Sequence, residues 1–402
     1  MIYYVASFLS DEISFTIHFM QNQKSSLYYI VFRIAIFLAI IFLLISCAPF
    51  ANTSAISTKE TPKASSITNT ALIATVEPTQ IPPRTPPELP AIYQSKYLNP
   101  LDMPHTYIED VCQYLRNRWN PAGAQPGAVV MIIMIHGVYK GPVEQSGGIN
   151  VGDLATMMEQ LHKQGFDAID TKQFLAFMER NIKIPARSVL IIQDDRHQAD
   201  NFNKNFRDYW ENWGWPIVNG WQSQPDTPES LWQENITLEN EGWVDHQAQG
   251  VMIGTFMTDD SSKAVITREL QGSIDAFAQR YGKTPLAFIW PGGGFGYRPV
   301  LAARQLGYQL GFTSNSRGPV MYNWVPQANE EDPKRPSFIP EGNIGDPLMT
   351  LPRYWPYQVV DAIDQVRIMG NEAAAYAQAN KAIELEYYDI VCAPTHGPLP
   401  SP

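Results

Sequence analysis

From about residue 97 onward, short apolar runs alternate with stretches whose apolar residues recur at helical spacing. Residues 128–138 and 188–195 contain the clearest apolar runs, and both runs end in polar residues. Residues 150–166 carry apolar side chains three or four positions apart and end around Gly165, which predicts an amphipathic helix. Buried strands that alternate with helices predict a parallel sheet, and so many units in one domain favour a (β/α) barrel.

The same reading predicts the remaining elements of the C-terminal part. Helical patterns cover residues 229–242, 262–282, 298–308 and 361–386. Strand-like runs lie within 242–254, 285–294, 309–315 and 347–356, and residues 387–394 are predicted to form the closing strand.

Polar residues that could carry chemistry collect where the predicted strands end. Asp194 and Asp195 follow the apolar run 189–192, His136 ends the first strand, and His396 follows the predicted closing strand. In barrels of this kind, functional residues gather at the ends of strands. Two adjacent carboxylates in a dry site need a partner to remain ionised, and a divalent metal is the usual one. The alternative is that both aspartates merely cap the next helix.

The N-terminal third has the pattern of a signal peptide followed by a flexible linker. Arg33, an apolar run over 34–45 and the ending LLISC at Cys47 are typical of a lipoprotein signal peptide, and an uncleaved signal anchor is the alternative. Residues 48–96 are rich in Thr, Ser and Pro and predict a disordered linker. The predicted organisation is therefore a signal peptide (1–47) with lipidation at Cys47, the linker (48–96) and one folded domain (97–402).

The amino-acid composition limits the classes of partner and cofactor that the chain can bind. The net charge of −11 argues against nucleic acid. The 10 Trp, 19 Tyr and 18 Phe suit either a carbohydrate-facing surface or an aromatic core. Three cysteines without a CxxC motif exclude a thiolate zinc site. Cys112 and Cys392 could pair after export or remain as free buried thiols.

Three stretches resemble the polysaccharide deacetylases of the NodB-homology type (carbohydrate esterase family 4), over residues 128–360. MIIMIHGV is similar to the first strand motif, LIIQDDRHQADNF to the TFDDGxxxN motif, and AFIWPGGGFGYRPVLAARQLGYQLGFTSN to the third motif. LPRYW, at 351–355, is similar to a later strand whose arginine lies close to the site. The resemblance implies a distorted (β/α) barrel and a divalent metal, usually zinc, held by one Asp and two His.

Carried over residue by residue, the resemblance assigns the chemistry. Asp194 corresponds to the general base and Asp195 to a metal ligand. His246 and His197 are candidates for the remaining metal ligands, and His396 is a candidate catalytic acid or substitute ligand. A metal would lower the pKa of a bound water to about 7, and a carboxylate would take its proton.

Five further residues are candidates for contact with the substrate. They lie at the predicted strand ends or in the matched motifs, and they are His136, Trp290, Pro291, Gly292 and Arg353.

The sequence departs from the family at the His pair, which the family writes HxxxH. If His246 is the first His, the second position is Gly250. If strand length sets the register, the pair falls on Gln249 and Ile253, and both ligands are absent. Arg196 also replaces a small Gly, and its guanidinium could pair with Asp194 and neutralise the base.

Two functions follow from these observations. The first is a metal-dependent polysaccharide deacetylase, a C–N hydrolase that is exported, held at the membrane by a lipid anchor and monomeric. The second is a carbohydrate-binding surface lipoprotein that has lost the metal site and does not catalyse. A solute-binding lipoprotein is disfavoured because the motifs point to a single barrel and not to two lobes.

Overall fold

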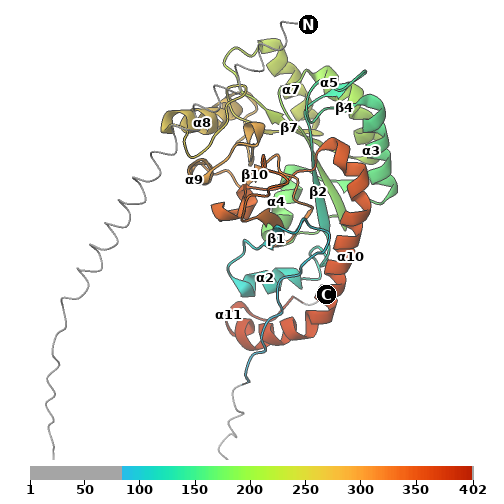
Figure 1. Cartoon of the computed structure of the whole chain (residues 1–402), viewed down its shortest axis with the longest axis vertical. Helices are drawn as coiled ribbons and strands as arrows, with labels where there is room; N and C mark the ends of the chain where they lie inside the picture. Colours follow the sequence, from blue (N-terminus) through green and yellow to red (C-terminus); the bar gives the residue numbers. More distant parts are fainter. Residues whose placement is uncertain (1–83, 401–402) are drawn as a thin grey trace, which may run out of the picture. The chain divides into compact units, whose positions relative to one another are not determined.

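The computed structural model describes residues 84–400, and a curled parallel sheet forms its centre (Figure 1). The eight-stranded sheet has the order β10-β9-β8-β7-β6-β2-β11, with β5 paired to β6. All its pairings are parallel except that of β11 with β2. The strands are β2 (Val129–Ile135), β5 (Asp167–Ala168), β6 (Arg187–Gln193), β7 (Ile217–Trp221), β8 (Val244–Ala248), β9 (Ala287–Ile289), β10 (Leu310–Phe312) and β11 (Val320–Met321).

An irregular segment closes the gap between the two ends of the parallel run. Leu351 forms a parallel bridge with Phe312 of β10, and Tyr354 forms one with Ile133 of β2. The backbone amides of Leu351 and Tyr354 donate to neighbouring strands on the two sides. The predicted distorted (β/α) barrel is thereby confirmed, and residues 351–354 act as its closing strand.

β2 is apolar throughout, and β6 is apolar over residues 189–192, because both faces of these strands are buried. In β2, Val130 and Ile132 pack into one hydrophobic cluster, while Met131 and Ile133 pack into another. A strand covered on both faces reads as a continuous apolar run and not as an alternating one. This explains why the runs at 129–135 and 189–192 were the strongest strand signals in the sequence.

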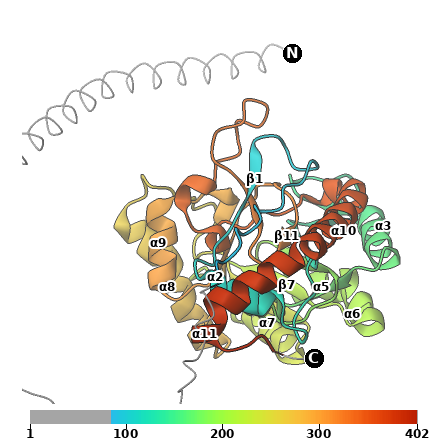
Figure 2. The same ribbon diagram turned by 90° about the horizontal axis from the view of Figure 1, so that it is seen from below.

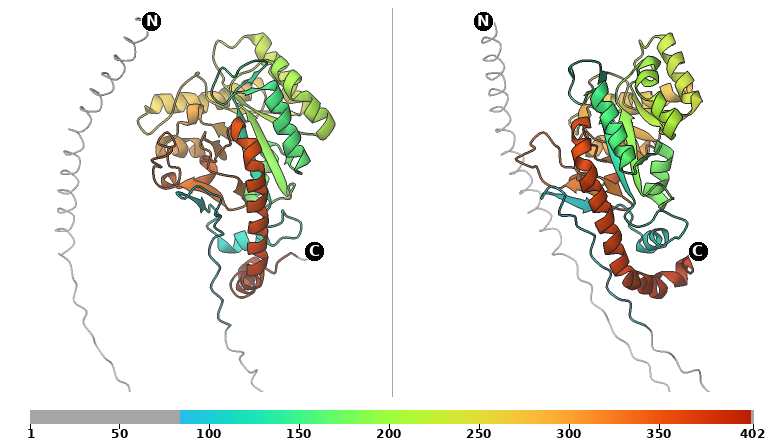
Figure 3. Two further views of the ribbon diagram at one scale, coloured as in Figure 1. Left: turned by 45° about the vertical axis from the view of Figure 1, so that its right-hand side comes forward. Right: turned by 90° about the vertical axis from the view of Figure 1, so that its right-hand side faces the viewer.

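Helices surround the barrel, as the views in Figures 1 and 3 show. The long helix α10 lies along one side next to α3, and α8 packs beside α9 on the opposite side (Figure 2). The helices are α2 (Val111–Arg118), α3 (Val151–Lys163), α4 (Thr171–Arg180), α5 (Ala199–Asn205), α6 (Arg207–Trp213), α7 (Glu229–Glu241), α8 (Lys263–Arg280), α9 (Tyr297–Gln305), α10 (Pro356–Tyr387) and α11 (Ala393–His396). Short turns of other helix types are η1 (Pro291–Gly293), η2 (Gly342–Ile344), η3 (Pro347–Met349) and the π-helix η4 (Tyr388–Cys392).

Two small sheets and an N-terminal strap complete the domain. The antiparallel pair is β1 (Asp102–His105) with β12 (Val325–Ala328), and the parallel pair is β3 (Val138–Tyr139) with β4 (Ile149–Asn150). Residues 84–96, which the sequence assigned to the linker, contact the domain. The Tyr93 hydroxyl donates to Glu372, and the Tyr376 hydroxyl donates to the Ala91 carbonyl. This end of the predicted linker is therefore part of the folded domain.

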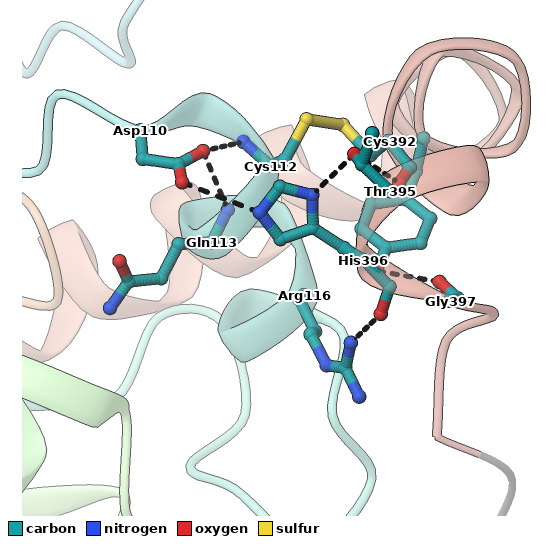
Figure 4. Close-up of a disulfide and its surroundings, with 9 residues drawn as sticks. Asp110, Cys112, Gln113, Arg116, Cys392, Thr395, His396 and Gly397 are labelled. Atoms are coloured by element: carbon teal, nitrogen blue, oxygen red, sulfur yellow. Dashed lines mark hydrogen bonds and ion pairs between the residues drawn. A yellow bond between two sulfur atoms is a disulfide. The ribbon is translucent and has the colours of Figure 1, made fainter.

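The predicted closing strand at 387–394 is wrong, because this segment is helical. It continues α10 through η4 and ends in α11. Tyr388 and Cys392 lie four residues apart on one helical face and are buried against α2. Cys392 also forms a disulfide with Cys112 of α2 (Figure 4), which confirms the pairing alternative for these cysteines.

Among residues 84–400, no helix is long and apolar enough to cross a membrane. Cys47 and the signal peptide predicted for residues 1–47 lie outside the described residues.

Candidate functional site

Four neighbouring strands each place a polar residue directly after their last residue. His136 follows β2, Asp194 follows β6, Gln222 follows β7 and Gln249 follows β8. The strands are parallel and adjacent in the sheet, so these four residues lie at one end of the barrel. The candidate site is built on this row of strand ends.

Asp194 is held in a buried ion pair. Its Oδ1 accepts a 2.5 Å hydrogen bond from Nη1 of Arg353, and both side chains are almost fully buried. Nε of Arg353 donates to the Thr313 carbonyl at 2.6 Å, and Nε2 of His136 lies 3.5 Å from Oδ2 of Asp194. Arg353 was predicted to contact the substrate, but this buried arginine pairs with Asp194 and does not line the pocket described below.

Asp195 is surrounded by side-chain amides. Nε2 of Gln222 lies 3.0 Å from its Oδ1, and Nε2 of Gln249 lies 3.5 Å from the same oxygen. Oε1 of Gln249 accepts a 2.6 Å hydrogen bond from the Asp195 backbone amide. The backbone of Asp195 has φ = 71°, a left-handed conformation that Asp tolerates better than most residues. The turn therefore directs Asp194 and Asp195 to different surroundings.

The pKa of Asp195 is raised, because burial and then the neighbouring charge of Asp194 disfavour its ionised form. A folded-state pKa above the unfolded value means that folding binds protons more tightly, so this group lowers stability as pH rises above the usual Asp range. We expect Asp195→Asn to raise the free energy of unfolding at pH 7. The gain should shrink as the pH falls towards 4, because protonation of the wild-type carboxyl removes the cost of burying its charge. Urea denaturation at both pH values measures the free energy of unfolding. A gain that does not depend on pH would contradict a raised pKa at Asp195.

A pocket of about 430 Å³ opens beside Asp195. Amides, one carboxylate, a histidine, a guanidinium and apolar groups line it: His136, Gln145, Asp195, Arg196, Gln222, Gln249, Ile253, Gly254, Phe256, Pro291 and Gly292. We call it the amide pocket. Three of the predicted substrate-contact residues, His136, Pro291 and Gly292, thus lie in its wall.

Phe256 forms an exposed aromatic wall of the amide pocket, with 58% of its surface accessible. It packs against the loop after β9. A Cβ at Gly292 would lie 1.9 Å from a ring carbon of Phe256, and Gly292 has φ = 58°. Both the space and the backbone conformation therefore require glycine at this position. The PGGG motif lets an aromatic ring reach the pocket.

His246 lies away from the pocket, buried between β8 and α7. Its Nδ1 lies 2.9 Å from Glu239, and its Nε2 lies 3.0 Å from Oδ1 of Asn235. Burial lowers the pKa of His246. Burial alone would raise the pKa of Glu239, but its hydrogen bond with His246 and the Lys283 ammonium lower it to about 2. The predicted metal ligand is instead part of a structural polar cluster.

His197 and Trp290 are also placed differently from the predictions. Nε2 of His197 lies 3.0 Å from the His136 carbonyl and 2.9 Å from the Asp194 carbonyl, so it faces backbone oxygens. Burial lowers the pKa of His197. Trp290 is fully buried, and its indole donates to the Met349 carbonyl at 2.8 Å. Trp290 supports the barrel and does not line the pocket.

His396 lies at the opposite end of α10 from the site. The helix begins at Pro356, three residues after Arg353, and its 32 residues span about 48 Å at 1.5 Å per residue. Nε2 of His396 lies 3.4 Å from Asp110, and its carbonyl accepts from Arg116 (Figure 4). The prediction of a catalytic His396 is wrong because it relied on a closing strand that is helical.

The donors at the site do not fit a catalytic divalent metal. Such a zinc site needs three protein ligands from His, Cys, Asp or Glu. Among residues 84–400, no group of three such side chains is placed to hold a metal ion. The Gln249 side chain occupies the strand-end position, and Ile253 lines the same pocket. β8 ends at Ala248, so Gln249 and Ile253 stand at the two positions that the register set by strand length names.

Sequence reasoning missed Gln145, Gln222 and Phe256 as residues of the pocket. Titratable groups at strand ends are the signal of a reactive site in a sequence, and a glutamine or an exposed phenylalanine gives no such signal. For Gln222 a usable signal existed, because it follows an apolar strand just as Asp194 does.

Comparison with known proteins finds similarity at the level of solved structures. The chain is similar to a Streptococcus pyogenes deacetylase, PplD, solved with acetate, at 15% identity and TM-score 0.47, covering 60% of this chain and 99% of that one. It is similar to IcaB from Ammonifex degensii at 13% identity and TM-score 0.44, covering 61% and 98%. A polysaccharide deacetylase from Bacillus cereus matches at 14% identity and TM-score 0.42, covering 58% and 69%.

No protein-family model and no curated protein sequence matches the chain. The structural likenesses concern the arrangement of the chain, and no conclusion about chemistry rests on them.

Proposed function

We propose that the domain is a carbohydrate-binding protein with a polysaccharide deacetylase-like barrel, and that its amide pocket holds a neutral sugar unit of a polysaccharide. One observation carries the proposal. The carboxylate of Asp195 is surrounded by the amides of Gln222 and Gln249, where hydrolysis through a metal would require His, Cys or carboxylate donors. Amides both donate and accept hydrogen bonds, as sugar hydroxyls and acetamido groups do.

The size and walls of the pocket support this ligand class. Its volume of about 430 Å³ lies in the range of small-molecule sites, roughly 300–1,000 Å³. Phe256 offers an exposed aromatic face, and Gln145 adds a third amide to the lining. A polar rim with one aromatic wall suits a ring that has a hydroxylated edge and an apolar face.

Deacetylation is the second candidate, and one observation favours it. The buried Arg353–Asp194 pair lies at the strand end where the resemblance places the general base. In this case Asp194 would take a proton from the water that attacks the acetyl carbonyl. Asp194 is only 1% exposed and is absent from the pocket lining, which favours binding over hydrolysis.

We further propose that the protein is exported and anchored at the membrane through Cys47. The Cys112–Cys392 disulfide supports this, because such bonds persist in oxidising compartments. The disulfide bears on export alone, and the proposed anchor rests on the LLISC ending at Cys47, which lies outside the described residues.

We expect Phe256→Ala to weaken the binding of an N-acetylated oligosaccharide about tenfold, which corresponds to about 1.4 kcal/mol. Calorimetric titration of residues 84–402 with a chito-oligosaccharide measures this change. Tyr297→Ala is the matched control, because Tyr297 is also exposed, at 57%, but does not line the pocket.

Acetate release and metal content in the same samples separate the two candidate functions. Saturable binding without acetate release supports the binding protein. Acetate release that is lost in Asp194→Asn would support the deacetylase and contradict the first proposal.

A further inference from the structure

Arg196 has a different partner from the one that the sequence suggested. Asp194 is paired with Arg353, while the Arg196 guanidinium donates to the hydroxyl of Thr227. Within residues 84–400, no carboxylate lies within ion-pair distance of Arg196. This cationic side chain is therefore not used to neutralise the candidate base.

Arg196 lines two neighbouring pockets. One is the amide pocket, and the other is a more open pocket of about 640 Å³. We call the second one the basic pocket. Its lining consists of Val138, Lys140, Val151, Arg196, His197, Gln198, Asp200, Asn201, Lys204 and Asn205. Arg196 belongs to both linings, so the two pockets adjoin at this side chain.

The basic pocket has an excess of positive charge. Its lining holds Lys140, Arg196 and Lys204, and one carboxylate, Asp200. Asp200 pairs with Lys204 within α5. Lys140, like Arg196, has no ion-pair partner in the described part of the chain. Among the described residues, the basic pocket therefore has two cations without an ion-pair partner, Lys140 and Arg196, although the net charge of the chain is −11.

The hydrogen-bonding groups around these cations suit an anion attached to a sugar. Arg196 presents a planar set of donors that can bind a carboxylate, sulfate or phosphate in two-point contact. Gln198, Asn201 and Asn205 line the same pocket and offer amides for neighbouring hydroxyls. His197 faces backbone carbonyls, and burial lowers its pKa, so it adds no charge at neutral pH.

We propose that the basic pocket binds an anionic unit of the polysaccharide whose neutral unit occupies the amide pocket. The ligand is then an acidic polysaccharide that carries carboxylate, sulfate or phosphate groups next to an uncharged sugar. This inference rests on the proposed carbohydrate binding and adds the substrate class.

The test compares oligosaccharides of equal length by calorimetric titration at two ionic strengths. The probes are a neutral chito-oligosaccharide, a uronate-containing hyaluronan oligosaccharide, a sulfated chondroitin oligosaccharide and an oligosaccharide that carries phosphate groups. We expect at least one acidic probe to bind about tenfold more tightly than the neutral one at low salt. The difference should narrow at 0.5 M salt, where the Debye length is only about 4 Å. The probe that binds best distinguishes carboxylate, sulfate and phosphate.

Two variants test the pocket itself. Lys140→Gln should weaken binding of the acidic probe about fivefold without changing that of the neutral one, because Lys140 lines only the basic pocket. Arg196→Gln should abolish the preference for the acidic probe. Lys172→Gln removes the same charge from an exposed position outside both pockets and is the matched control.

Three results decide the matter. Equal affinity for neutral and acidic probes, or equal effects of Lys140→Gln and Lys172→Gln, would contradict anion binding in the basic pocket. Either result would leave the proposed sugar binding in the amide pocket unaffected. Failure to bind any probe would overturn the proposed function and this inference with it.

Discussion

Arg353→Met is expected to lower the free energy of unfolding by about 3–5 kcal/mol, because it leaves the carboxylate of Asp194 buried without its partner. Both side chains are almost fully buried, and their contact of 2.5 Å is direct. The variant also removes the hydrogen bond to the Thr313 carbonyl, which ties residues 351–354 to the end of β10. The loss of stability should therefore include part of the free energy that closure of the barrel contributes.

A second substitution separates the charge effect from the packing effect. In Arg353→Met with Asp194→Asn, no buried charge is left uncompensated, so we expect the double variant to recover about half of the lost stability. Urea denaturation of the wild type, the two single variants and the double variant forms a complete cycle. A loss below about 1 kcal/mol for Arg353→Met would show that the pair is hydrated and would contradict the buried geometry.

Local sequence patterns were sufficient to predict the barrel. The apolar runs that became β2 and β6 are buried on both faces, so each stood out as an uninterrupted run. The helical stretches had the spacing of residues that pack against a sheet, as in α3 with Leu154, Met157, Met158 and Leu161 buried. These local signals favoured a barrel, and the resemblance to the polysaccharide deacetylases implied its distorted form.

The closing strand was mispredicted because a short apolar run supports more than one structure. Residues 387–392, YYDIVC, favour a strand by composition, but strand propensity is a weak preference that packing overrides. A helix of 32 residues leads directly into this segment, and its continuation buries Tyr388 and Cys392 on one face. That long-range contact with α2 was not readable from the local pattern.

The candidate site was predicted in part, for a geometric reason. Asp194, Asp195 and His136 were found because they follow strong strands. The position of the His pair depended on where β8 ends, and the boundaries of strands are uncertain by a few residues in sequence reasoning. The strand ends at Ala248, which brings Gln249 next to Asp195 and leaves His246 buried behind the sheet. A shift of three residues thus changed the predicted chemistry of the pocket.

The double variant Gln249→His with Ile253→His is expected to create a zinc site. Gln249 already contacts Asp195, and Ile253 lies in the wall of the same pocket. With two imidazoles and one carboxylate, the pocket would offer three protein ligands and an open fourth position, as catalytic zinc sites do. We expect zinc content to rise from below about 0.1 to about one per chain, and zinc affinity to increase at least a thousandfold, about 4 kcal/mol.

The controls for this variant test both the register and the ligand set. Moving the pair to the other register, with Gly250→His alone beside the native His246, should give no zinc site, because His246 is fully buried and bonded to Glu239 and Asn235. Adding Asp195→Ala to the designed pair should abolish zinc uptake, since it removes the carboxylate ligand. Zinc content by elemental analysis after dialysis decides between these outcomes. Two outcomes would contradict the proposed positions: one zinc per chain in the Gly250→His variant, or no zinc in the designed pair. Either would mean that Gln249 and Ile253 do not stand where the two histidines of a metal-dependent barrel would be. In that case the amide pocket would have to be explained without a lost metal site.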